Sequence, residues 1–434
     1  MSTSYHGTFI HAVSPSHIEI LPATTVVVSD VGVITHIVRG DLRSIPSKVR
    51  ELAPSPIILG DNEFFIPGFV DTHVHAPQYA YAGAGTHVPL MTWLTEYAFP
   101  TEVKMRDPDY AQEVYSKLVH RMVANGTTTA LYFATIDVDP CIRFAKILQE
   151  KGQRAFVGKV CMDRNAPPEY VETTAESLSR TEEFFTAVAA LQTDLIEAVV
   201  TPRFIPTCTP ELLRGLGELA ERHGARVQSH LSESRDEVAF VEALHPGEGS
   251  DSDIFAAAGL ITSKTVMAHS IYLSDNDEQL LRARGCGLAV CPMSNYFFAG
   301  STFPIRERMD KGLKCGLGTD VAGGYSPSML QNIRALVLAS RGRNHYDSTA
   351  LIADYKCGFY VATRGGAAAL GLEGVVGGFA VGMQFDALRI KVGGPSNPVD
   401  VFPGDDWERK FEKFVNLGDE RSIKGVWVKG RQIA

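Results

Sequence analysis

Short apolar runs, each the length of one buried strand, recur along the chain after residue 66. The eight runs are Phe69–His75, Thr128–Ala134, Ala155–Cys161, Ala198–Phe204, Arg226–His230, Thr265–His269, Gly287–Cys291 and Lys314–Thr319. They are rich in Val, Ala, Leu and Phe, which is typical of strands buried on both faces. Most are separated by segments with helical periodicity, such as Asp109–Ala124, Pro210–His223 and Asn276–Arg284. This alternation predicts parallel strands, and eight of them predict an α/β fold with a closed (β/α)8 TIM-like barrel.

The two ends of the chain have a different pattern. Residues 8–66 contain short alternating runs, and residues 384–392 and 423–434 are again strand-like, with glycines between them. We expect both ends to form one small β-sandwich domain that is discontinuous in sequence. The predicted division is a β domain of residues 1–66 plus 372–434 and a barrel of residues 67–371.

One connection is too long to be a turn. Residues 76–106, between the first predicted strand and the next helix, contain the aromatic residues Trp93 and Phe99. Loops much longer than about 15 residues are commonly functional lids or disordered. Because this one is aromatic and apolar, we expect a lid over the barrel mouth. The alternative is a helical excursion that packs on the outside of the barrel.

Composition and charge exclude several classes of protein. The net charge is −9, and no basic stripe is present, which argues against a nucleic-acid partner. The N-terminus lacks a basic region followed by an apolar core, and no apolar run approaches a membrane span, so we expect neither a signal peptide nor membrane insertion. The seven cysteines are scattered without a C-x-x-C pair. They predict buried thiols in a reducing, cytoplasmic compartment.

Four histidines and one aspartate stand at the ends of predicted strands. His73 and His75 end the first run two positions apart, so they project from the same face of the strand. His230 and His269 end the fifth and sixth runs, and Asp320 follows the eighth. Active-site groups of a (β/α)8 barrel sit at the C-terminal ends of its strands, so these side chains are expected to converge. Imidazole and carboxylate ligands suit zinc, with iron possible.

The chain resembles the amidohydrolase superfamily, and within it the branch that deaminates guanine. The resemblance covers nearly the whole chain. It rests on the motifs Pro-Gly-Phe-Val-Asp-Thr-His-Val-His-Ala-Pro-Gln-Tyr (67–79), Thr-Pro-Arg-Phe (201–204), Ser-His-Leu-Ser-Glu (229–233), Met-Ala-His (267–269), Gly-Leu-Gly-Thr-Asp-Val-Ala-Gly-Gly (316–324) and Phe-Val-Asn-Leu-Gly-Asp-Glu-Arg (414–421). His-x-His and the late aspartate mark only the superfamily, whereas His-Ala-Pro-Gln-Tyr with Thr-Pro-Arg-Phe indicates the guanine branch.

The resemblance implies one zinc ion per subunit, held by His73, His75, His230 and Asp320. It also implies that His75 and His230 lie against the substrate. Some members of the superfamily bridge two metal ions with a carboxylated lysine, and Lys159 in the third run is the candidate for that role here. The deaminase branch resembles sites with a single metal, so we interpret Lys159 as a structural residue.

The implied reaction, guanine and water to xanthine and ammonia, needs groups that move protons. Zinc lowers the pKa of bound water toward neutrality, which provides a nucleophile for C2 of the purine. Asp320 is expected to orient this water and accept its proton. Glu233, three residues beyond His230, is expected to carry a proton to the ring nitrogen and the leaving amine. Its structural alternative is an acidic residue at a helix start. His269 is expected to contact the water or, alternatively, the metal.

Three further residues are expected to recognise guanine. The planar fork of Arg203 matches the O6/N7 edge of the ring, Phe204 packs against the purine, and Gln78 reads the N3 and amine side. The alternative for Arg203 is that it only pairs with an acidic side chain. The resemblance also implies a homodimer whose other partner is the small-molecule substrate.

Some positions depart from the family pattern. Met293, Phe297 and Phe298 are bulkier or less polar than expected and could reshape one wall of the pocket, and Ser270 follows His269 where glycine is common. These changes leave a deaminase of another heterocycle, such as a pterin, cytosine, adenine or a triazine, as the rival function. A non-catalytic barrel scaffold is a further alternative. The motifs of serine hydrolases and nucleotide triphosphatases are absent from the sequence.

Overall fold

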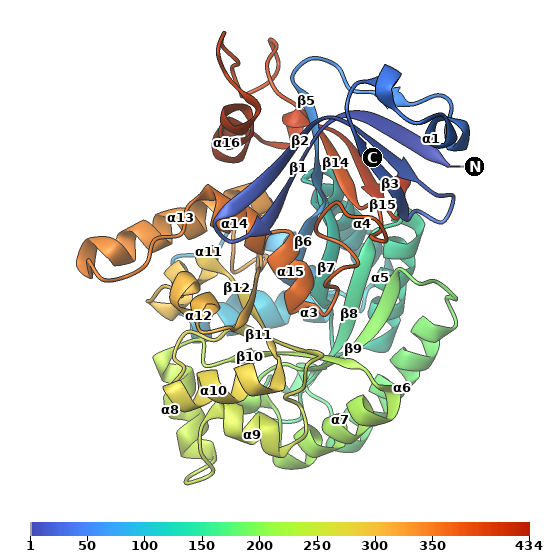
Figure 1. Cartoon of the computed structure of the whole chain (residues 1–434). Helices are drawn as coiled ribbons and strands as arrows, with labels where there is room; N and C mark the ends of the chain where they lie inside the picture. The colour runs from blue at the N-terminus through green and yellow to red at the C-terminus, as the bar shows by residue number, and fades with distance from the viewer. Residues whose placement is uncertain (1) are drawn as a thin grey trace.

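The computed structural model describes residues 2–434. Within these residues, eight parallel strands follow one another in sequence order around a nearly closed barrel (Figure 1). They are β6 (Phe69–His75), β7 (Thr127–Phe133), β8 (Arg154–Cys161), β9 (Ile196–Pro202), β10 (Arg226–Leu231), β11 (Thr265–His269), β12 (Gly287–Val290) and β13 (Lys314–Leu317). Each corresponds to one predicted run, so the barrel predicted from the apolar pattern is confirmed.

Helices cover the outside of the barrel (Figure 1). Those between the strands are α4 (Pro108–Ala124), α5 (Val138–Lys151), α6 (Thr174–Ala189), α7 (Pro210–His223), α8 (Arg235–Leu244), α9 (Asp251–Ala257), α10 (Asp275–Arg284), α11 (Pro292–Ser294) and α12 (Ile305–Asp310). After β13 come α13 (Met329–Tyr346) and α14 (Tyr355–Val361). Side-chain caps start several of them, as at Asp107, Thr173 and Thr209, because each satisfies backbone N–H groups of the first turn. Their apolar faces pack on the strands and form the main core.

The barrel closes between its first and last strands at the residues that carry the predicted chemistry. The Asp320 N–H donates to the His73 carbonyl at 2.8 Å, and the His75 N–H donates to the Val321 carbonyl at 3.0 Å. The buried Asp71 carboxylate accepts from the Thr319 hydroxyl at 2.6 Å and from its N–H at 3.0 Å. Closure of the fold therefore fixes His73, His75 and Asp320 relative to one another.

The end of the barrel away from these residues is filled with apolar side chains. Val70, Leu131 and Phe156 belong to a buried cluster inside the barrel. Helix α15 (Arg364–Ala369) packs against β6, β12 and β13, and it contributes Ala367 to the same cluster. A Cβ at Gly287 would lie 2.2 Å from the Ala369 carbonyl oxygen, so this close approach requires glycine. The interior is therefore a packed core, and open space remains only toward the strand C-termini.

The strands from the two chain ends are hydrogen-bonded into one mixed sheet, which lies beside the barrel with both termini (Figure 1). Its strands are β1 (Thr3–Ser14), β2 (His17–Val28), β3 (Ile34–Arg39), β4 (Ile57–Ile58), β5 (Glu63–Pro67), β14 (Ala387–Lys391), β15 (Ile423–Val428) and β16 (Arg431–Gln432). The prediction of a β domain assembled from both ends is confirmed. In detail, the pairing of β5 with both β1 and β14 joins the ends into a single sheet.

Aromatic side chains from both ends of the chain pack on the two faces of this sheet. Tyr5 stacks on Phe385 with ring centroids 4.8 Å apart, and Phe65 lies 5.3 Å from Trp427. On the opposite side, Phe64 meets rings of α16 (Trp407–Leu417), a helix that the sequence pattern did not predict. Two short helices, α1 (Ser47–Leu52) and η1 (Leu42–Ser44), lie between β3 and β4.

Residues 76–106, which we call the mouth segment, are built from helical turns. These are η2 (Ala76–Tyr81), α2 (Leu90–Trp93), η3 (Leu94–Ala98) and α3 (Phe99–Lys104). Trp93, Leu94 and Phe99 pack with Phe133 and Val160, which come from the ends of barrel strands. The segment therefore lies across the barrel mouth rather than on its outer surface, and its movement as a lid stays a prediction.

Two smaller expectations can be compared with the structure. Among residues 2–434, no helix combines the length and apolarity needed to cross a bilayer. All seven cysteines are buried and free of disulfides within the same residues. Burial raises the pKa of the Cys141 thiol to about 12, so this thiol is largely protonated and inert near neutral pH.

Candidate active site

The structure brings the four strand-end histidines and Asp320 together at the mouth of the barrel. The His73 Nε2 lies 3.2 Å from Asp320 Oδ1, and the Nε2 atoms of His75 and His230 are 3.0 Å apart. The His269 Nε2 lies 3.7 Å from Asp320 Oδ2. All five side chains are almost completely buried. The convergence follows from barrel closure, because parallel strands end at the same edge.

The donor set fits a metal ion. His230 Nδ1 donates to the Arg203 carbonyl at 2.6 Å, which leaves a lone pair on His230 Nε2 facing His75 Nε2. The buried His73 Nε2 has no hydrogen-bond partner within residues 2–434. Burial lowers the pKa of His75 and His230 well below its ordinary value, so both imidazoles are neutral at neutral pH. Inward-facing lone pairs beside a carboxylate are what a cation requires.

Asp320 supplies the negative charge of this cluster. Burial by itself opposes ionisation of the carboxyl group, but His73, His269 and Ser294 together outweigh it and hold the pKa of Asp320 at about 2. The group is therefore a carboxylate at neutral pH. It lies within reach of His73, His75 and His269, which makes it a bridge between the histidines.

Several site residues adopt left-handed backbone conformations. The φ angles are 62° for His269, 51° for Ser270 and 49° for Asp320. Such conformations cost non-glycine residues on the order of 1–3 kcal/mol and cluster at functional sites. The conformation of Ser270 explains why the family favours glycine after this histidine, since glycine adopts positive φ without strain.

Glu233 lies beside the proposed ligands without joining them. Its Oε1 is 3.7 Å from His269 Nε2, and its carboxyl group borders the cavity described below. Its backbone N–H donates to Glu237 at 2.7 Å, which fixes the turn between β10 and α8. Burial raises the pKa of the Glu233 carboxyl, and Asp320 adds to this while His269 opposes it. A carboxyl with a raised pKa can carry a proton, which the proton-transfer role requires.

His269 is oriented by a residue that the sequence analysis gave no role. Its Nδ1 donates to Asn295 Oδ1 at 3.0 Å, so its Nε2 faces the two carboxylates. Asn295 ends the Cys-Pro-Met-Ser-Asn motif at residues 291–295, and the motif was the available signal. Although burial alone would lower the pKa of His269, Glu233 and Asp320 raise it above its ordinary value.

A cavity at the barrel mouth is bordered by these groups. One wall is apolar and contains Leu90, Trp93 and Leu94 of the mouth segment together with Phe298. Trp93 and Phe298 meet with ring centroids 5.2 Å apart. The opposite wall is formed by the charged and imidazole side chains. An apolar wall with a few convergent polar groups is typical of small-molecule sites.

Of the three bulky residues expected to reshape this pocket, the structure places one in its lining. Phe298 lines it, as expected. Met293 is buried, and Phe297 is 41% exposed, but neither is among the lining residues. Only one of the three departures from the family pattern therefore alters the cavity wall.

Arg203, Phe204 and Gln78, the residues expected to recognise the purine, all border the cavity. His75 and His230 line it as well. Arg203 is also paired with Glu102 of the mouth segment, with Nη1 to Oε2 at 2.7 Å and Nη2 to Oε1 at 3.1 Å. Glu102 could not be identified from the sequence, because nothing near residue 102 indicates an ion-pair partner one hundred residues further along the chain.

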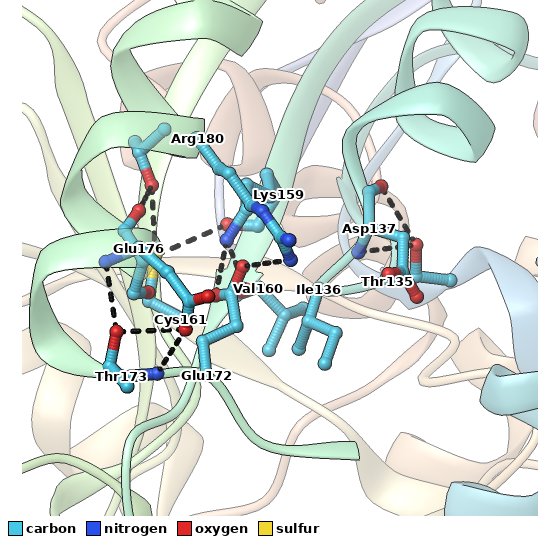
Figure 2. Close-up of polar contacts among 12 residues, drawn as sticks. Thr135, Ile136, Asp137, Lys159, Val160, Cys161, Glu172, Thr173, Glu176 and Arg180 are labelled. Carbon is cyan, nitrogen blue, oxygen red and sulfur yellow. Dashed lines mark hydrogen bonds and ion pairs between the residues drawn. The ribbon is translucent and has the colours of Figure 1, made fainter. Parts of the chain in front are cut away.

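Lys159 points away from the metal ligands. Its Nζ donates to Glu172 Oε2 at 2.7 Å and to the Val160 carbonyl at 3.2 Å (Figure 2). Arg180 on α6 reaches the other oxygen of Glu172 at 3.2 Å. On the same strand the neighbouring Gly158 faces Thr201 and Gln228 instead. Lys159 therefore lies between β8 and the helices, which excludes a lysine bridge and favours its structural interpretation.

Comparison with known proteins agrees with this geometry. A family model described as the amidohydrolase family matches residues 64–433. Guanine deaminase of Mus musculus is 42% identical over 99% of this chain and 96% of that protein, and guanine deaminase of Dictyostelium discoideum is 39% identical over 99% and 97%. A crystal structure of guanine deaminase from C. acetobutylicum with bound guanine is 32% identical, covers both chains completely and superposes with a TM-score of 0.93.

Proposed function

This chain belongs to the amidohydrolase family and, within it, to the guanine deaminases, and from this premise we propose that it hydrolyses guanine to xanthine and ammonia. The observation that carries the proposal is that Glu233, His269 and Asp320 line the same cavity as Arg203, Gln78 and Phe204. One set of residues has the chemistry for hydrolysis, and the other has the hydrogen-bonding groups for a purine.

We propose zinc as the metal, with iron as the alternative. His73, His75, His230 and Asp320 would hold it. The donor nitrogens of the three histidines lie within 4.8 Å of one another, and His73 groups in the same way with Asp320. The buried His73 nitrogen has no hydrogen-bond partner within residues 2–434. Nitrogen and carboxylate donors suit zinc. When bound, the ion would supply Lewis acidity that brings the pKa of water toward neutrality.

The chain's own residues move the protons. Asp320 takes a proton from the water that adds to C2 of guanine, and His269, held by Asn295, fixes the position of that water. Glu233 donates its proton to the adjacent ring nitrogen, takes the proton of the new hydroxyl on C2 and passes it to the leaving amine. The proton held by Asp320 then restores Glu233. The C2–N bond breaks, ammonia departs, and the ring regains its planarity as xanthine. Positioned acid–base groups of this kind typically contribute 10²–10⁴-fold to the rate.

Recognition of the purine depends on three other residues that line the cavity. Arg203 offers N–H donors to the O6/N7 edge, Phe204 packs against the ring, and Gln78 reaches the N3 and amine side. Trp93 and Phe298 close the apolar wall over the ring plane. The mouth segment would thereby exclude water from the reacting centre.

The direct test is ammonia release and xanthine formation from purified, zinc-loaded protein with guanine, adenine, cytosine and a pterin. We expect rapid turnover of guanine. Turnover of a different ring but not of guanine would retain the hydrolytic site and discard the proposed substrate. Failure on all four rings with metal bound would favour the non-catalytic scaffold.

We expect Arg203→Ala to lower kcat/KM for guanine roughly 10–100-fold, because a good bidentate contact with a guanine edge is worth about 1–3 kcal/mol. Metal content should stay unchanged. The substitution also leaves Glu102 buried without its partner, so the melting temperature should fall. Steady-state kinetics and mass-spectrometric metal analysis measure both effects, with exposed Arg214→Ala on α7 as the control. An unchanged kcat/KM would remove Arg203 from the recognition site.

We propose that the protein is a homodimer. Large apolar side chains are exposed on α13, where Leu338 is 69% and Tyr346 is 90% accessible, and this helix extends to the edge of the molecule (Figure 1). A second copy of the chain that packs on this helix would cover these apolar side chains. Light scattering at micromolar concentration should give twice the mass of one chain, and Leu338→Glu should lower it. A single-chain mass for the unmodified protein would contradict the proposal.

A further inference from the structure

Glu102 is a buried side chain that accepts hydrogen bonds from two residues of the proposed recognition site. It belongs to α3 of the mouth segment, and its side chain is 1% exposed. It accepts from Arg203 through both oxygens, and its Oε1 also accepts from Gln78 Nε2 at 2.9 Å. Glu102 itself does not line the cavity among the described residues. It therefore acts on anything in the cavity only through Arg203 and Gln78.

The carboxylate fixes the plane and direction of the Arg203 guanidinium. Two parallel N–H to oxygen bonds hold one edge of the fork, at 2.7 and 3.1 Å. The Phe99 ring, also from α3, lies 5.0 Å from the guanidinium carbon and restricts movement out of the plane. Because α3 contributes both contacts, this helix fixes the orientation of the Arg203 N–H groups that are not bonded to Glu102.

The same carboxylate fixes which end of the Gln78 amide faces it. The amide NH2 donates to Glu102, while the amide oxygen lies 3.4 Å from the Ala322 N–H, which donates to it. A flipped amide would place its oxygen against the carboxylate and lose both contacts. Gln78 thus presents a fixed polarity beside the metal ligands.

We propose that Glu102 is the positioning residue that makes the cavity selective for the atom at C6 of the purine. This inference rests on the proposed function, since it assumes that Arg203 reads the O6/N7 edge. A guanidinium has only N–H donors, so a rigidly held one accepts a ring with acceptors on that edge. It rejects a ring with an amine at C6, because two sets of donors then face each other. Without Glu102 the guanidinium can turn away, and this rejection is relaxed.

The test compares guanine with 2,6-diaminopurine in wild-type and Glu102→Gln protein. Both rings carry the amine at C2 that leaves, and they differ only at C6. Losing a charge-assisted contact should lower kcat/KM for guanine roughly 10–100-fold, mainly through KM. The value for 2,6-diaminopurine should change by less than about threefold, so the preference for guanine shrinks by about tenfold or more. Exposed Glu96→Gln in the same segment is the matched control and should leave the preference unchanged.

A double-substitution cycle separates positioning from a general structural effect. In an Arg203→Met background, adding Glu102→Gln removes both members of the ion pair, so the ratio of the two substrates should not change further. A preference for guanine that is unchanged in Glu102→Gln would overturn the inference. So would a further fall in the preference when Glu102→Gln is added to Arg203→Met.

Two measurements keep the inference testable in difficult cases. If Glu102→Gln does not fold, Glu102→Asp keeps the charge but cannot reach both partners, and an undiminished preference in that variant would overturn the inference. If wild-type protein shows no preference for guanine, the proposed function fails instead. The inference is then judged by a crystal structure of Glu102→Gln, where an undisturbed Arg203 and Gln78 would refute the positioning role.

Discussion

Glu233→Gln protein should bind metal and guanine normally and lose nearly all turnover. Glutamine has almost the same shape as glutamate but cannot donate and accept a proton at the ring nitrogen. General acid–base catalysis of this kind is worth roughly 10²–10⁴-fold, so kcat should fall by about that factor. The raised pKa of Glu233, caused by burial, is consistent with a group that carries a proton in the resting site.

The measurement is the initial rate of ammonia release, with guanine affinity and metal content determined on the same preparation. Glu242→Gln is the matched control, because Glu242 is exposed on α8, the helix that follows Glu233. Its kinetics should equal those of wild type. Normal turnover in Glu233→Gln would assign the proton transfer to another group, and a loss of metal would show that Glu233 supports the ligands instead.

Removing the metal should abolish turnover, and restoring zinc should recover it. The buried histidines and Asp320 offer two overlapping groups of donors, and the proposed reaction obtains its nucleophile from the Lewis acidity of the bound metal. Dialysis against a chelator should therefore give inactive protein. Its melting temperature should also fall, because an ion that binds only the folded state stabilises it.

Substitution of a single ligand provides the site-specific form of this test. His75→Ala should lower the metal content well below one ion per chain and remove activity, whereas exposed His120→Ala on α4 should change neither. Adding back zinc, iron or manganese to the stripped wild-type protein identifies the metal that supports turnover. Full activity of metal-free protein would rule out the metal-dependent mechanism.

Local pattern was enough to identify the strands and the residues at their ends. Each barrel strand is an apolar run bounded by polar residues or glycine, and this pattern depends only on burial of both faces. A known rule then places functional groups at the C-terminal ends, which is why His73, His230 and Asp320 could be grouped from sequence alone. The departure at Ser270 was also visible, although its positive φ was not.

Residues whose role depends on contacts between distant segments could not be identified from the sequence. Glu102 has no local feature that distinguishes it from other helical glutamates, and its partner Arg203 is separated from it by the whole first part of the barrel. Helix α16 was missed as well, although its aromatic side chains pack on Phe64 of the end-derived sheet. In both cases the deciding interaction forms only after the chain has folded.

The sequence by itself determined the barrel, the small sheet from both ends and the histidines and aspartate that meet at the strand ends, because periodicity and strand-end position are local properties. Only the tertiary structure decided that Lys159 faces the helices, that Phe298 rather than Met293 lines the cavity, and that Glu102 holds Arg203 and Gln78. These facts depend on which neighbouring element each side chain packs against and on which buried charges pair. Both are decided by packing between segments that are distant in the sequence.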